Sequence, residues 1–230
     1  MFHRSMWKCL AGFLSAWAFA GCSAEALPEG EAPVTQASDT ADPSSGERNT
    51  EVGATAQPLG AFSHLLPQRG SQKGIVESHF LGSGMMYAMN LRTGALVDSV
   101  SASFYTPSLA NNRYTTGDPF FLRGPVGGTA GSAQPRLECP AGYAAYGLCG
   151  RSGDRIDQLG LICAQIGGDG GPVVSTQQGI GAFGGTGGTA FTDTCGAGKW
   201  LTGMNVTIAL KSSGTNKIVS SVQGFCSNAS

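Results

Sequence analysis

The feature that most constrains this chain is a repeated unit bracketed by cysteines. One copy runs from Cys139 through an Arg-Ser-Gly turn at residues 151–153 to Cys163. A second copy runs from Cys195 to Cys226. Both copies begin with a glycine-containing segment that leads into a strand of alternating apolar and polar residues. A hairpin tip and a second strand of the same kind follow. Because the apolar residues alternate with period two, the repeat predicts several similar antiparallel sheets.

A fainter third copy precedes these two. Its Arg-Thr-Gly turn at residues 92–94 aligns with the turn at 151–153, and Phe80 and Phe104 then fall on the two cysteine positions. An aromatic pair in place of a cysteine pair fits a buried cross-strand position. The copies begin near residues 80, 139 and 195, so the period is roughly 57 residues, or about four strands.

Three units of about four strands predict an all-β fold of three four-stranded antiparallel sheets with pseudo-threefold symmetry around one core. The 36 glycines follow no Gly-X-Y period, which excludes collagen. We place this domain at residues 71–230, with repeats at about 71–122, 123–178 and 179–230. The alternating residues expected to face the core are Ile156, Leu159, Leu161, Met204, Val206 and Ile208.

The cysteines are consistent with an exported protein. We predict that each bracketing pair forms a disulfide, Cys139 with Cys163 and Cys195 with Cys226, and that Cys149 is buried outside these pairs. A zinc site is the other interpretation of several cysteines, but the chain has no Cys-x-x-Cys motif and three histidines. We therefore expect no metal and no cofactor.

The first 22 residues have the pattern of a signal peptide. Basic residues precede an apolar run at 10–20 that is too short for a permanent membrane span. The ending Phe-Ala-Gly-Cys at 19–22 resembles a bacterial lipobox, which implies lipidation of Cys22; the alternative is an ordinary signal peptide cleaved nearby. Ser23 after the cysteine favours the outer membrane of the cell envelope, by resemblance to other lipoproteins. Residues 23–70 are expected to be a disordered linker.

Composition and spacing exclude several classes of function. A net charge of −1, with 13% charged residues, does not favour a nucleic-acid partner. Residues 167–172 look like a serine-protease loop but lack the serine, and only His64 and His79 follow the signal as bases. Asp154 and Asp157 lie too close in one turn for the two carboxylates of a glycosidase. We therefore expect a protein that is not an enzyme.

The middle and last copies resemble the jacalin-related lectins. Residues 124–128, 139–147, 150–157 and 160 are similar to the last repeat of those lectins, which carries a Gly-Arg-Ser-Gly-x-x-Leu-Asp-x-Ile-Gly stretch. Residues 184–191, Asp193 and the strand from Leu201 are similar to their first repeat. The order is changed, as in a circular permutation. The resemblance covers residues 123–226 well and 75–105 loosely, and it implies a β-prism.

The resemblance also implies a shallow sugar site between two loops. One is a glycine-rich turn that ends at Gly188, and the other comprises Gly153, Asp154, Arg155 and Asp157. A carboxylate at Asp157 can accept hydrogen bonds from sugar hydroxyls, and backbone N–H groups at 154, 155 and 188 can donate. By the same resemblance, Asp154 implies glycans of the mannose or glucose type.

Two other interpretations of these residues stay open at this level. Residues 184–188 can be a tight turn alone, and Asp157 can cap the preceding turn, since Asp98 occupies the same place in the first copy. The competing function is a structural or adhesive coat protein that binds no sugar. The two functions differ in whether loops 153–157 and 184–188 converge.

Overall fold

The computed structural model describes residues 62–80, 84–110, 113–211 and 215–228, and these form strands and loops only. In this part of the chain there is no helix with the length and hydropathy needed to cross a membrane. The expected signal peptide, the lipidation site at Cys22 and the linker up to residue 61 lie outside the described residues, so those expectations stay predictions.

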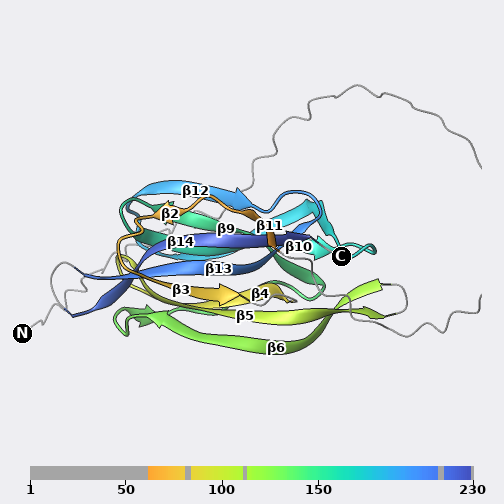
Figure 1. Ribbon diagram of the computed structural model, residues 1–230, viewed down its shortest axis with the longest axis horizontal. Helices are drawn as coiled ribbons and strands as arrows, with labels where there is room; N and C mark the ends of the chain where they lie inside the picture. The colour runs from red at the N-terminus through yellow and green to blue at the C-terminus, as the bar shows by residue number, and fades with distance from the viewer. Residues whose placement is uncertain (1–61, 81–83, 111–112, 212–214, 229–230) are drawn as a thin grey trace, which may run out of the picture.

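Three antiparallel sheets make up the fold and are called first, middle and closing by their order along the chain. In the view of Figure 1, β12 and β9 of the middle sheet lie above β14 and β13 of the closing sheet, and β5 and β6 of the first sheet lie below them. The first sheet has the order β6-β5-β4-β7, with β8 also paired to β4. The middle sheet has the order β11-β10-β9-β12. The first sheet comprises β4 (Met85–Thr93), β5 (Val97–Ala110), β6 (Arg113–Gly127), β7 (Ser132–Ala133) and β8 (Leu137–Glu138). The middle sheet comprises β9 (Tyr143–Ser152), β10 (Ile156–Ile166), β11 (Pro172–Gly184) and β12 (Thr189–Thr194).

The closing sheet joins the two ends of the described chain. Its central strands β13 and β14 form a hairpin, and β1, β2 and β3 from the other end of the domain flank them. This sheet comprises β1 (Phe62–Leu65), β2 (Arg69–Gly70), β3 (Ile75–Phe80), β13 (Lys199–Leu210) and β14 (Lys217–Asn228). The prediction of three antiparallel sheets is confirmed; the middle sheet has the expected four strands, whereas the first and closing sheets have five each.

Each sheet is built on one of the three predicted hairpins, in the register that the sequence alignment gave. The residue aligned with the second cysteine faces an equivalent residue of the neighbouring strand in every copy: Phe104 faces Met86, Cys163 faces Ala145 and Cys226 faces Leu201. The sheets nevertheless do not coincide with the predicted repeats. The strands β7 and β8, from the second predicted repeat, complete the first sheet, and β12, from the third, completes the middle sheet. Sequence periodicity locates a hairpin but does not show which hairpin an edge strand joins.

The structured region begins earlier than expected, because β1 and β2 lie within the predicted linker. Leu66 between them is 2% exposed and packs in the core. The guanidinium of Arg69 donates two hydrogen bonds to the Asp193 carboxylate, over 2.7 and 2.6 Å, and lies over the ring of Phe191. These partners stand more than 120 residues away in the chain. Local composition could not indicate them.

The core lies between the three sheets. Its fully buried members include Trp200, whose indole N–H donates to the carbonyl of Gly170 over 2.7 Å. The six residues predicted to face the core are all buried: Ile156, Leu159, Leu161, Met204, Val206 and Ile208.

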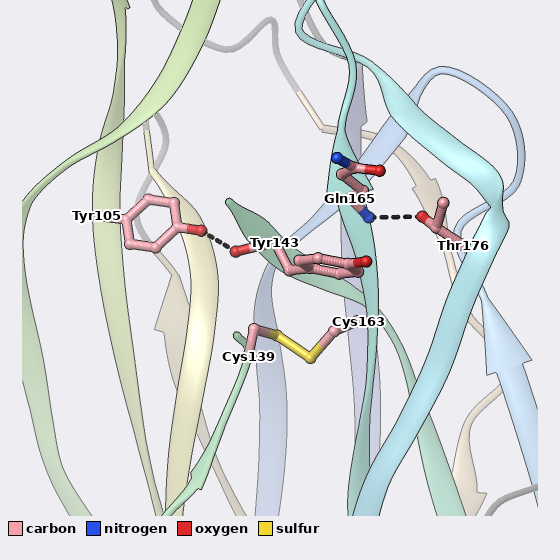
Figure 2. The surroundings of a disulfide bond; sticks show 6 residues. All are labelled: Tyr105, Cys139, Tyr143, Cys163, Gln165 and Thr176. Carbon is pink, nitrogen blue, oxygen red and sulfur yellow. Dashed lines mark hydrogen bonds between the residues drawn. A yellow bond between two sulfur atoms is a disulfide. The ribbon is translucent and has the colours of Figure 1, made fainter. Parts of the chain in front are cut away.

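Both predicted disulfides are present. Cys139 pairs with Cys163, and Cys195 pairs with Cys226. Cys149 is fully buried, as expected. Figure 2 shows the first disulfide beside a contact between sheets, in which the hydroxyl of Tyr105 donates to the backbone carbonyl of Tyr143. Burial raises the pKa of Tyr105, so this hydroxyl remains a donor even at a pH at which an exposed tyrosine would ionise. Each of these two disulfides lies near the open end of a hairpin.

Candidate functional site

The two loops of the predicted site meet at one end of β9. This strand pairs with β10 on one side and β12 on the other. Its last residue, Ser152, is therefore opposite both Ile156, just after the hairpin tip, and Thr189, just after the glycine-rich turn. The register of these three strands brings the loops together, although about 30 residues separate them in sequence.

Hydrogen bonds fix the glycine-rich turn against the hairpin. The N–H of Gly185 donates to the carbonyl of Asp157 over 2.8 Å. The guanidinium of Arg151 donates from Nε to the carbonyl of Gly187 and from Nη2 to that of Gly188, both over 2.8 Å. A Cβ added at Gly153 would lie 3.8 Å from the Cα of Gly188, so the two loops are separated by about the space of one methyl group. The convergence that the sequence left open is present.

The carboxylate of Asp157 lies directly against this turn. A Cβ added at Gly187 would stand 2.3 Å from its Oδ1, and one added at Gly188 would stand 2.6 Å from its Oδ2. Gly188 also has a φ of 60°, a conformation that side-chain-bearing residues rarely adopt. A side chain at Gly188 would therefore collide both with the backbone of Ser152 and with the half-buried Asp157.

Around this carboxylate the surface is open and polar. Gly153, Asp154 and Gly188 are exposed, and Arg155 is half-buried with an Nη1 atom that is buried and has no hydrogen-bond partner. The arrangement offers a carboxylate acceptor, a guanidinium donor and backbone groups within one small area. Such a set can bind a ligand that carries several adjacent hydroxyls. Among the described residues, no three His, Cys, Asp or Glu side chains gather as metal ligands.

All five predicted site residues thus lie on the two converging loops. Sequence reasoning did not identify Arg151 as the residue that holds the glycine-rich turn in place. The available signal was that this arginine belongs to the repeated Arg-x-Gly turn and has a counterpart at Arg92. The protease-like stretch at 167–172 forms the turn between β10 and β11 and the start of β11, which confirms the interpretation as a connection.

Neither a protein-family model nor a curated protein sequence matches the chain. Among solved structures, it is similar to a mannose-binding jacalin-related lectin from Ananas comosus, with a TM-score of 0.50 and 14% identity over 72% of this chain and 97% of that one. A Malaysian banana lectin gives a TM-score of 0.48 and 15% identity over 74% and 99% of the two chains.

The likeness to the pineapple lectin extends over nearly the whole of that protein, and three antiparallel sheets around one core are present here as well. At this identity the likeness concerns the fold. The chain has the β-prism fold of the jacalin-related lectins.

Proposed function

We propose that this chain binds carbohydrate without transforming it, through loops 153–157 and 184–188. The observation that carries the proposal is the convergence of these loops around the Asp157 carboxylate, beside which Gly187 and Gly188 leave the backbone of the turn uncovered by side chains. A pyranose presents adjacent hydroxyls that both donate and accept. The carboxylate accepts from two of them, and backbone N–H groups of the loops donate to others.

A ligand of the mannose or glucose type fits this site best. The pineapple protein of the same fold is a mannose-binding lectin, which supports this class. Asp154 is exposed at the hairpin tip, so that edge of the site is polar. An open site of this kind binds one sugar weakly, with a Kd of roughly 1 mM or about 4 kcal/mol. Useful affinity then requires several sites that act together.

Hydrolysis of the bound glycan is not part of the proposal. A glycosidase holds two carboxyl groups about 5 to 9 Å apart on opposite sides of the scissile bond. Here Asp154 and Asp157 belong to one hairpin tip, on the same side of any sugar that rests on the loops. The site can therefore position a glycan but does not flank a bond within it.

The full chain, displayed multivalently on a glycan array, tests the proposal. We expect signals for mannose- or glucose-type glycans that disappear in Asp157→Ala. The matched control is Asp169→Ala, which removes an exposed aspartate from the turn at the other end of β10 and should leave every signal in place. Silence from folded wild-type protein would instead support the structural coat function.

We also propose that the domain is displayed on the bacterial outer membrane by acyl chains on Cys22. The apolar run at residues 10–20 and the Phe-Ala-Gly-Cys ending support this placement. Metabolic labelling with radioactive palmitate should label the wild-type chain and not Cys22→Ser. Equal labelling of both would contradict the anchor.

A further inference from the structure

The three sheets have corresponding edge strands, and two of these are covered by a neighbouring sheet. Each such strand pairs with the first strand of its sheet's hairpin: β8 with β4, β12 with β9 and β3 with β13. On β8, Leu137 is buried, and a Cβ added at Gly181 of β11 would lie 3.5 Å from its side chain. The edge of the middle sheet therefore covers β8.

The strand β12 is covered by the closing sheet. Its Phe191 and Asp193 are both buried. Arg69 of β2 reaches across from the closing sheet, donates two hydrogen bonds to the Asp193 carboxylate and lies over the Phe191 ring. Contacts between neighbouring sheets thus protect both of these edge strands.

The third edge strand, β3, is exposed. It follows the turn at residues 71–74, in which the N–H of Ser71 donates to the carbonyl of Ser220 over 2.9 Å. Ile75 and Val76, the first two residues of β3, are 71% and 55% exposed. Because successive residues of a strand point to opposite faces, neither face is packed where the strand begins.

The strand β3 is also a regular template for another strand. It pairs with β13 over six consecutive residues without a bulge, and within the described ranges no strand pairs with its other side. Its sequence, Ile-Val-Glu-Ser-His-Phe, contains neither the proline nor the lysine that often protects an exposed edge. Isoleucine and valine favour strand pairing. The remaining protection is the exposed charge of Glu77.

The residue types of β3 favour a second copy of the chain as the partner strand. In an antiparallel pair with twofold symmetry, the central residue lies opposite its own counterpart. Centring on Glu77 would place two carboxylates opposite each other, which is destabilising. Centring on Ser78 instead places Glu77 opposite His79 of the second copy, and Val76 opposite Phe80 of the second copy.

We propose that two copies of the chain dimerise through β3, antiparallel and centred on Ser78, so that their closing sheets join into one continuous sheet. Five residues of each strand, 76–80, lie opposite one another in this register. The opposed residue types are apolar with apolar and acidic with basic, which stabilises cross-strand pairs. The dimer does not depend on sugar binding. Where the proposed function also holds, each dimer carries two copies of the proposed site and gains avidity from them.

The interface is small, so the dimer should be reversible. Standard interfaces contain about 20 to 30 residues from each partner, and this one centres on a single short strand. We expect a Kd on the order of 100 µM. Display of many chains on one surface would raise their local concentration and favour the pair.

Sedimentation velocity of the full chain, from about one tenth of this Kd to ten times it, tests the dimer. Every sample carries Cys22→Ser, so that acyl chains cannot drive association. We expect a monomer–dimer equilibrium that Val76→Asp weakens by about tenfold or more, because a charge replaces an apolar cross-strand contact. The matched control is Val174→Asp, which changes an exposed valine on β11 and should leave the equilibrium in place. Because both valines are exposed, both variants should keep the wild-type circular dichroism spectrum.

A charge exchange tests the register. Glu77→Lys should weaken the dimer by about tenfold, because symmetry alters two opposed pairs at once. His79→Glu alone should also weaken it, since two glutamates then lie opposite each other. The double variant Glu77→Lys, His79→Glu should restore a dimer at least as tight as wild type. In a register centred on residue 77 the double variant would place two lysines opposite each other, and no rescue would follow.

Each outcome decides the proposal without reference to sugar. Monomers at every concentration would refute the dimer and leave the proposed function untouched. A dimer that Val76→Asp does not weaken would lie on another surface, which also refutes pairing through β3. Weakening by Val76→Asp without rescue by the charge exchange would overturn the register centred on Ser78. Loss of glycan binding by wild-type protein that still dimerises would refute the proposed function alone.

Discussion

The middle sheet and the closing sheet share one backbone contact between turn and hairpin, but they differ in side chains and in hairpin length. The closing-sheet hairpin continues past this contact through the pairs Ala209–Ile218 and Leu210–Lys217. In both sheets, the turn donates an N–H to a carbonyl of the hairpin, at 2.8 Å beside Asp157 and at 2.9 Å beside Ser220. Of these two sheets, the middle one alone adds a carboxylate and an arginine that holds the turn. The comparison shows that the backbone contact belongs to the fold, whereas the carboxylate and the arginine on which the proposed sugar site depends are absent from the closing sheet.

The strongest way to perturb the closing sheet alone is to remove its disulfide. The double variant Cys195→Ala, Cys226→Ala should lower the free energy of unfolding by about 2–5 kcal/mol, because an unfolded chain without the cross-link has more conformations. Denaturant unfolding measures this loss. The folded fraction should still bind sugar with wild-type affinity, since the site belongs to another sheet. A folded variant that had lost binding would show that the two regions are coupled.

Replacing the Asp157 carboxylate tests the difference in side chains between the middle sheet and the closing sheet. Asp157→Asn should weaken binding by about 1.5–3 kcal/mol, because a hydrogen bond to a charged group is replaced by one to a neutral group. Ser220→Ala, the equivalent position of the closing sheet, should leave the affinity unchanged. Isothermal titration with methyl α-mannoside measures both. Equal losses from the two variants would mean that the carboxylate has no direct part in binding.

Adding a methyl group at Gly188 or Gly74 tests the close backbone packing that the turns of the middle and closing sheets share. Gly188→Ala and Gly74→Ala should each cost about 1–3 kcal/mol of stability, because the new Cβ would stand 2.4 Å from the Ser152 carbonyl carbon or 1.9 Å from the Ile208 carbonyl oxygen. Only Gly188→Ala should also lose sugar binding.

The control for these variants is Gly196→Ala, at a φ of 82° with no atom within 4 Å of the added Cβ. It carries the backbone strain without the collision, so its Tm should fall less than that of Gly188→Ala. Equal losses of Tm would attribute the effect to φ alone.

The smallest effect is expected from the charge of Asp98 in the first sheet. Burial raises the pKa of its carboxyl, and this outweighs Lys211, Arg92 and the N–H of Gly94, which lower it. Because the folded-state pKa is raised, the ionised form destabilises the fold above that pKa, and the penalty disappears below the unfolded-state pKa. Asp98→Asn should therefore raise Tm at pH 7 and lose this advantage at about pH 3. A gap in Tm that stays constant with pH would contradict this account.

The sequence predicted the elements whose signals are local. The cysteine spacing gave both disulfides, and the alternation gave six buried residues from Ile156 to Ile208. The equivalence of Phe104 with the second cysteine of the other copies also followed from the alignment. These predictions succeeded because the two strands of a hairpin are close in sequence. The spacing of cysteines and of apolar residues within one stretch of chain therefore shows which residues pair.

The tertiary structure decided which separate stretches meet. The sequence of residues 127–131, Gly-Gly-Thr-Ala-Gly, differs from that of residues 184–188 at one position, but the pairing of β5 with β6 is what places it beside Asp98. Likewise, Leu66 and Arg69 are part of the fold only because their partners lie at the far end of the chain. Strand pairing across sheets depends on long-range contacts and on the shape of a common core, and neither is encoded within one stretch of residues.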